Sequence, residues 1–236
     1  MSDFTPSRRR LMLGAGTLGL GAVGLALSGC GGDHDADVTA NEDLMREHGV
    51  IRRALFIYTE AAHRARQQPA TIPITALLDT AKLFREFAED YHEHALEEAH
   101  IFPVVRKLKT PVAALPDVLQ AQHQRGREIT DYLLKITAGS AVPFGESLRF
   151  ANALDSLVAM YGPHAAREDT VLFPAWKAAL GPRHYADMGE QFEDIEHQTF
   201  GHDGFNDAVA RIAKAEEAFG LSDLAKVTAP AAPQLS

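Results

Sequence analysis

The chain has 236 residues, of which 46% are hydrophobic and 23% are charged, a composition that is ordinary for a globular protein and argues against general disorder. Asp and Glu outnumber Lys and Arg by 32 to 23, so nucleic acid is not expected as a partner. The single cysteine excludes an intrachain disulfide and any site built from several thiolates, so a metal would need His and carboxylate ligands.

The N-terminus has the features of an export signal. An arginine-rich stretch at 7–10 precedes an apolar, glycine-rich run at 11–27, and its paired arginines resemble a twin-arginine signal. The run ends in Leu-Ser-Gly-Cys, which resembles the lipobox of bacterial lipoproteins, where cleavage precedes acylation of the cysteine. We therefore expect an export signal at 1–29, a flexible linker at 30–40, and a lipid on Cys30 that holds the protein on the periplasmic or cell-surface side of the cytoplasmic membrane. A plain signal or an uncleaved anchor is the alternative, although the run is short for a spanning helix.

Helical patterns separated by proline and glycine fill the remainder of the chain. Four long helices are expected at about 41–68, 73–108, 117–138 and 146–180, followed by shorter ones at 183–200 and 206–219. Inward stripes are expected on the first helix at Leu44, His48, Ile51, Leu55, Tyr58 and Ala62, and on the third at Leu119, His123, Gly126, Thr130 and Leu133. The sequence thus predicts an all-α fold, with an up-down four-helix bundle at 41–180, two additional C-terminal helices at 181–220 and a tail at 221–236.

One helix face occurs twice along the chain. The first copy runs Phe84, Phe87, Tyr91, His94, Glu98, Ile101, and the second runs Leu154, Leu157, Tyr161, His164, Glu168, Val171. Steps of three and four residues place each copy on one side of an α-helix, which we expect to face the core. An ionised carboxylate in a core needs a positive partner, and a metal ion is a partner that also binds imidazole. The repeat therefore predicts a metal site.

The other two long helices each add one histidine to this prediction. The expected metal ligands are His48, His94, Glu98, His123, His164 and Glu168. Because a carboxylate can bridge two cations, these residues would hold two metals with three or four protein donors each. Imidazole and carboxylate suit iron, manganese or zinc, and we expect two iron ions, with manganese or zinc less favoured.

Several neighbouring residues allow other interpretations. His92 and His100 lie off the predicted inward face and are expected to remain outside the site. Glu97-x-x-His100 has the spacing of ferritin-like di-iron proteins, but those need a second copy, which the four-helix repeat lacks. Tyr91 and Tyr161 precede the repeated histidines by one turn, where they would orient ligands, serve as redox-active phenols, or simply fill the core.

Four segments resemble the hemerythrin-like (HHE cation-binding) family over about residues 41–180. They are Glu47-His48-Gly49, then His94 to Glu98 followed by Ile101-Phe102-Pro103, then Gln122-His123, and His164 to Glu168 followed by Val171-Leu172-Phe173-Pro174. The resemblance implies a four-helix bundle that holds a non-haem di-iron centre with bridging carboxylates. It also implies binding, sensing or handling of dioxygen, nitric oxide, peroxide or iron.

The sequence departs from the oxygen-carrying hemerythrins, which have a His pair one turn apart on the third helix. Here the residues one turn from His123 are Leu119 and Arg127, and Arg127 is expected to shape the open side of the site. The carriers' second carboxylate is an aspartate five residues after its His, a spacing that Asp169 has here, whereas the repeated face favours Glu168. Fewer histidines favour redox chemistry or sensing over simple carriage.

These observations predict an exported di-iron protein that binds or senses dioxygen or a related small molecule such as nitric oxide or peroxide. A di-iron redox enzyme acting on peroxide or an oxidisable substrate is one alternative. A structural or metal-storage lipoprotein is the other.

Overall fold

The computed structural model describes residues 38–143 and 145–233, and every regular element in these two ranges is a helix. The predicted all-α class is therefore confirmed. The predicted export signal, Cys30 and most of the predicted linker lie outside the described residues. Within the described ranges, no helix is both long enough and apolar enough to cross a membrane.

The helical elements follow one another through short connections. In chain order they are α1 (Ala40–Gln67), η1 (Pro69–Thr71), α2 (Ile74–Leu83), η2 (Phe84–Ile101), α3 (Phe102–Val105), η3 (Pro111–Ala114), α4 (Leu115–Ile136), α5 (Ser147–Arg167), η4 (Glu168–Leu172), α6 (Phe173–Phe200), α7 (Gly204–Phe219) and η5 (Leu224–Val227). The helices predicted at 41–68 and 117–138 correspond to α1 and α4, with ends that differ by two residues or fewer.

Local chemistry fixes both ends of α1. The Thr39 hydroxyl accepts a hydrogen bond from the backbone N–H of Glu42, and the Glu42 carboxylate accepts one from the backbone N–H of Thr39 at 2.8 Å. This reciprocal cap satisfies two N–H groups that have no partner inside the helix. Pro69 follows the other end, where its missing N–H and fixed ring prevent the helix from continuing.

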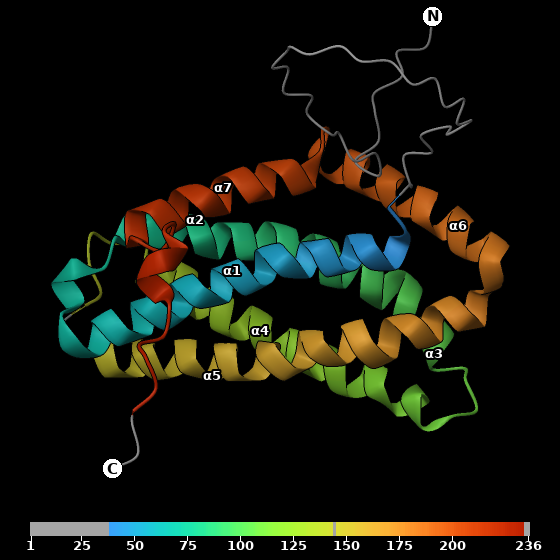
Figure 1. Cartoon of the computed structure of the whole chain (residues 1–236), viewed down its shortest axis with the longest axis horizontal. Coiled ribbons are helices and arrows are strands. Elements are labelled where there is room, and N and C mark those ends of the chain that lie inside the picture. Colours follow the sequence, from blue (N-terminus) through green and yellow to red (C-terminus); the bar gives the residue numbers. More distant parts are fainter. Residues whose placement is uncertain (1–37, 144, 234–236) are drawn as a thin grey trace, which may run out of the picture.

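Four long helical segments surround a common interior. α1 packs against α5 and η2, and α4 packs against the same two segments, as the ribbon shows (Figure 1). α7 lies across α1 and α2. α6 changes direction at Gly181, whose φ of +71° is accessible to glycine at little cost. Its first part thus extends α5 and η4, and its second part leads to α7.

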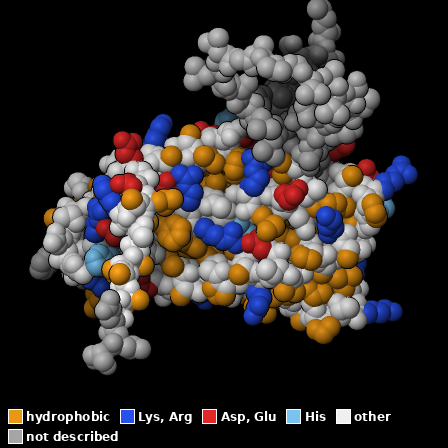
Figure 2. Space-filling model, viewed as in Figure 1, with side chains coloured by type: hydrophobic (Ala, Val, Ile, Leu, Met, Phe, Trp, Pro, Cys, Tyr) orange, Lys and Arg blue, Asp and Glu red, His pale blue; other side chains and the backbone are white. Residues whose placement is uncertain are grey.

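Ion pairs on the outer surface connect these layers. Arg53 of α1 donates two hydrogen bonds to Glu216 of α7, at 2.8 and 2.6 Å, and Arg66 of α1 pairs with Asp155 of α5 at 2.5 Å. Figure 2 shows basic and acidic side chains interspersed with hydrophobic ones on the face in view. Such half-exposed pairs fix the register of neighbouring helices more than they add to stability.

The second long helical segment is π-helical over η2 rather than α-helical. In a π-helix each N–H bonds to the carbonyl five residues earlier, so side chains five apart share a face. Two rows of side chains at this spacing are buried, and each member is 2% exposed or less. One row consists of Phe87, His92, Glu97 and Phe102, and the other consists of Tyr91, Leu96 and Ile101. The predicted inward face, with its steps of three and four, is therefore wrong at His94, whose side chain is 71% exposed.

Candidate metal centre

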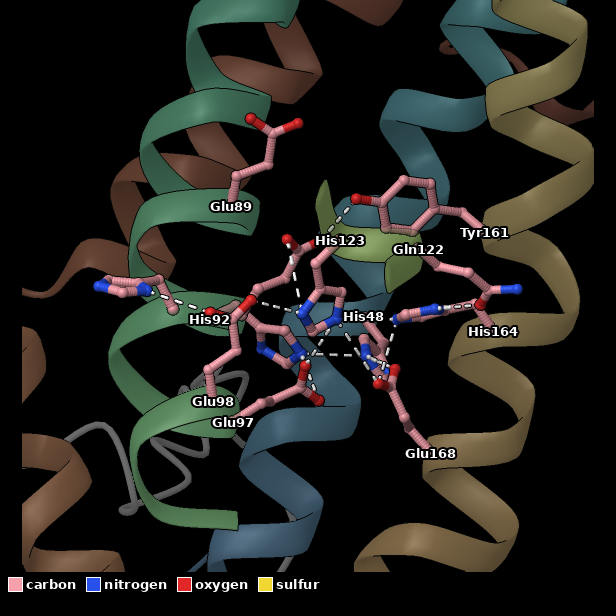
Figure 3. A network of polar contacts seen from close by, with 12 residues as sticks. His48, Glu89, His92, Glu97, Glu98, Gln122, His123, Tyr161, His164 and Glu168 are labelled. Carbon is pink, nitrogen blue, oxygen red and sulfur yellow. Dashed lines mark hydrogen bonds and ion pairs between the residues drawn. The ribbon is translucent and has the colours of Figure 1, made fainter. Parts of the chain in front are cut away.

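Four imidazoles and two carboxylates meet where the four long segments face one another (Figure 3). They are His48 of α1, His92 and Glu97 of η2, His123 of α4, His164 of α5 and Glu168 at the start of η4, and each is 4% exposed or less. The structure thus brings together four residues of the predicted set, at positions 48, 123, 164 and 168.

The imidazoles form two pairs. In the first ring pair, the Nε2 atoms of His48 and His92 are 3.0 Å apart. In the second ring pair, the Nε2 atoms of His123 and His164 are 3.1 Å apart. Each pair therefore turns two nitrogen atoms of the same kind toward one point, an arrangement that a shared cation would stabilise.

The two carboxylates each extend from one ring pair to the other. Glu97 places Oε1 3.5 Å from His92 Nε2 and Oε2 3.4 Å from His123 Nε2. Glu168 does the same with the remaining ring of each pair, at 3.4 Å from His48 and 3.1 Å from His164. Around the second ring pair, Glu97 and Glu168 complete a set of four donors; around the first ring pair, Glu97 completes a set of three, and Glu168 lies beside His48.

Metal ions would satisfy the buried carboxylates better than the surrounding side chains do. Glu97 and Glu168 are completely buried, yet none of their four carboxylate oxygens accepts a hydrogen bond from any described residue. Leaving a buried carboxylate without a donor is costly, and a bound cation removes that cost. The enclosed cavity has a volume of about 10 Å³, room for roughly one water-sized sphere. The residues present therefore fit bound metal cations.

The other nitrogen of each ring has its own acceptor. In the first ring pair, Nδ1 of His48 lies 2.6 Å from Asp169 Oδ1, and Nδ1 of His92 lies 2.6 Å from Glu47 Oε2. In the second ring pair, Nδ1 of His123 lies 2.9 Å from Glu98 Oε1, and Nδ1 of His164 lies 2.8 Å from Gln122 Oε1. An acceptor at Nδ1 keeps the proton there and leaves the Nε2 lone pair free for a cation. Asp169 and Glu98 therefore orient imidazoles and lie outside the central cluster.

The remaining predicted residues contact carboxylates around the cluster. Tyr91 donates to Glu47 Oε1 at 3.1 Å, and Tyr161 donates to Oε1 of the buried Glu93 at 2.5 Å. Arg127 donates to Glu98 Oε1 at 2.7 Å, which fixes the acceptor of a central imidazole. Each of these three side chains therefore contacts a carboxylate that surrounds the cluster.

The carboxylates place the imidazoles in a negative field. Burial lowers the pKa of His123, but the surrounding glutamates Glu93, Glu97 and Glu98 outweigh it and raise the pKa to about 10. Burial also lowers the pKa of His48 and His92, but nearby carboxylates outweigh it and raise the pKa of both rings. A raised pKa means that a metal ion must compete with a proton for each of these rings.

The formal charge around the cluster favours bound cations. Six carboxylates lie in or against the cluster, on Glu47, Glu93, Glu97, Glu98, Glu168 and Asp169. Two guanidinium groups pair with these carboxylates, on Arg52 and Arg127. With neutral imidazoles, an excess of four negative charges remains. Two doubly charged ions would neutralise that excess in a region where uncompensated charge is costly.

Two predicted ligands lie elsewhere, and two central residues were missed. His94 is on the surface and Glu98 is an acceptor for His123, whereas His92 and Glu97 occupy the central positions. The physical reason is the π-helix, which rotates residues five apart onto one face. The buried apolar residues at 87, 91, 96, 101 and 102 carry this spacing and are the signal that could have revealed it.

The ferritin-like alternative is not formed. The His100 ring is half-buried beside the Phe192 ring, with centroids 5.9 Å apart, and it lies outside the central cluster. Glu97 therefore contributes to the centre without the histidine three residues later.

Comparison with known proteins places these observations in a family. The hemerythrin HHE cation-binding domain matches residues 39–176, which contain all six members of the central cluster. Uncharacterized proteins of Mycobacterium tuberculosis and Mycobacterium bovis are 39% identical over 220 residues, covering 86% of this chain and 85% of each relative. No solved structure matches the chain. The chain therefore belongs to the hemerythrin HHE cation-binding domain family.

Proposed function

We propose that the chain holds two iron ions and uses them to bind or sense dioxygen or a related small molecule, such as nitric oxide or peroxide. The observation that carries the proposal is the placement of Glu97 and Glu168, whose oxygens face both ring pairs and accept no hydrogen bond from the part of the chain that the structure describes. Each ring pair, with the carboxylate oxygens beside it, would hold one ion. We further infer that α1, α2–η2–α3, α4 and α5–η4 form an up-down four-helix bundle around them.

The donor set and the size of the cavity support this reading. Imidazole and carboxylate donors suit iron, manganese and zinc, and iron when bound supplies one-electron chemistry and open coordination positions. Three or four protein donors per ion leave room in the coordination sphere for a small ligand. The residues around the cavity restrict that ligand to a few atoms, because the space between them is about 10 Å³.

A redox enzyme acting on peroxide is the second candidate, and one residue favours it. Tyr161 is 2% exposed, its ring centroid is 5.2 Å from that of His164, and its hydroxyl is 2.5 Å from Glu93 Oε1. A buried phenol with an adjacent carboxylate has a proton acceptor in place if it loses an electron. This geometry suits turnover as well as it suits binding.

We also propose that the protein is exported and lipid-anchored. This proposal depends on the arginine-rich stretch at 7–10, the apolar run at 11–27 and the lipobox-like sequence that ends at Cys30. An exported protein would meet dioxygen or peroxide outside the cytoplasmic membrane.

Elemental analysis of protein purified without added metal is the direct test. We expect about two irons per chain, because the site offers one set of four donors and one set of three. We also expect near-ultraviolet bands in air that weaken on reduction, with peroxide turnover distinguishing an enzyme from a stoichiometric binder. Zinc in place of iron would favour a structural or storage role, and a chain that takes up no metal would contradict the proposal.

Replacing Asp169 with alanine is expected to weaken cation binding by about 10- to 100-fold, because His48 loses the acceptor that orients its ring. Competition with a chromogenic chelator measures this change. Asp155→Ala is the matched control, since this half-exposed carboxylate pairs with Arg66 on the outer surface. Equal affinities for the two variants would show that the Asp169 contact does not support the site.

A further inference from the structure

A line of metal-binding side chains runs from the surface to the centre on the η2–α4 side. His94 is 71% exposed, and its Nδ1 atom lies 3.2 Å from Oε2 of Glu98, which is 10% exposed. The other oxygen of Glu98 lies 2.9 Å from Nδ1 of the fully buried His123, whose Nε2 belongs to the second ring pair. Figure 3 shows Glu98 between His123 and the outer side of the helix.

A second set of cation-binding atoms lies along this line. Glu93, Glu98 and His123 each offer one ligand atom, and these atoms lie within 4.8 Å of one another. On the inner side of the same imidazole, Glu97 Oε2 is 3.4 Å from Nε2 and accepts no hydrogen bond from the described residues. Imidazole and carboxylate groups therefore follow one another from solvent to the central cluster without an apolar interruption.

The other approaches to the cluster are less favourable for a cation. On the α1–η4 side, Asp169 contacts His48 and also forms an ion pair with Arg52, whose guanidinium is 40% exposed. On the α4–α5 side, the contact to His164 is the uncharged Gln122. On the η2–α4 side, the two carboxylates of Glu93 and Glu98 outnumber the single guanidinium of Arg127 that pairs with them.

We propose that His94 and Glu98 form the route by which divalent cations enter the buried centre. A cation first binds the exposed imidazole and the outer oxygen of Glu98, then passes between Glu98 and Glu93 to the donors beyond His123. Arg127 contacts both carboxylates, at 2.7 and 3.4 Å, and neutralises them when no ion is in transit. The inference rests on the proposed function, because it requires the central cluster to bind cations.

Loading of the metal-free full-length chain with Co²⁺ alone tests the route, since the visible bands of bound Co²⁺ report both rate and coordination. We expect His94→Ala to load about tenfold more slowly, because the exposed imidazole that first binds the ion is lost, and to reach the same Co²⁺ content and spectrum. His94→Asp is expected to load at nearly the wild-type rate, because a carboxylate also captures cations. His63→Ala, which changes an exposed histidine of α1, is the matched control and should load normally.

The outcomes separate the route from the centre. Loading of His94→Ala at the wild-type rate would overturn the route, as would equal slowing by His63→Ala. A lower final Co²⁺ content in His94→Ala would also overturn it, because His94 would then support the bound state. If the wild-type chain takes up no Co²⁺, the proposed centre itself fails, whereas normal uptake with no effect of His94 removes the route alone.

Discussion

Replacing His92 with alanine is expected to reduce the metal content from two ions per chain to one or none. His92 supplies one of the two nitrogens of the first ring pair, and Glu47 orients it from the other side at 2.6 Å. Losing the ring leaves Glu97 Oε1 buried without a positive neighbour, which weakens binding further. Elemental analysis after dialysis against a weak chelator measures the remaining metal.

His94→Ala is the matched control for this experiment, because the two histidines lie two residues apart on the same helix. We expect His94→Ala to retain two ions per chain at equilibrium, since its side chain is exposed and outside the central cluster. The repeated face in the sequence, which places His94 inside and His92 outside, predicts the opposite result, with metal lost from His94→Ala and retained by His92→Ala. Loss of metal from His94→Ala together with retention by His92→Ala would show that the π-helical register of η2 is wrong.

Gly126→Ala is expected to destabilise the fold by about 1–3 kcal/mol, as overpacking in a close-packed core does. A Cβ atom at this position would lie 2.2 Å from the hydroxyl oxygen of Tyr161 and 3.0 Å from its Cζ. Tyr161 is buried and donates a hydrogen bond to Glu93, so its ring cannot move aside without losing that contact. Urea unfolding measures the change in free energy.

Gly49→Ala provides the control, because among the described residues no atom beyond its own stretch of helix backbone and its chain neighbours lies within 4 Å of the added Cβ. Replacing a helical glycine normally stabilises a helix by about 0.5–1 kcal/mol, so the two substitutions should act in opposite directions. Combining Gly126→Ala with Tyr161→Phe should recover part of the loss, since the atom at 2.2 Å is then absent. Equal stabilities for the two alanine variants would contradict the close contact.

The sequence predicted the regular helices well because α-helical geometry is the same everywhere. Every residue assigned to the inward stripes of the first and third helices is buried, from Leu44 to Ala62 on α1 and from Leu119 to Leu133 on α4. The same reasoning failed where the hydrogen-bonding pattern changes. In η4, Val171 was expected inside but is 39% exposed, and Leu172 is buried instead.

The central cluster was predicted in part for the same reason. His48, His123, His164 and Glu168 lie in or next to α-helical turns, where steps of three and four residues hold. The acceptors at Nδ1, including Glu47 and Gln122, could not be assigned from sequence. Those contacts depend on the rotamers and separation of two different helices, which no spacing along one helix specifies.

Because η2 is π-helical, the number of residues in this segment matters more for the centre than the identity of most of them. The row that contains His92 and Glu97 lies beside the row that contains Glu93 and Glu98, and the two rows differ by one position along the chain. A conservative substitution alters one contact and leaves both rows in place. Deletion of a single residue between His92 and Glu97 would bring Glu98 to the position that Glu97 now occupies, and insertion of one would bring the apolar Leu96 there. Related chains that keep this centre should therefore vary in composition across η2 while keeping its number of residues constant.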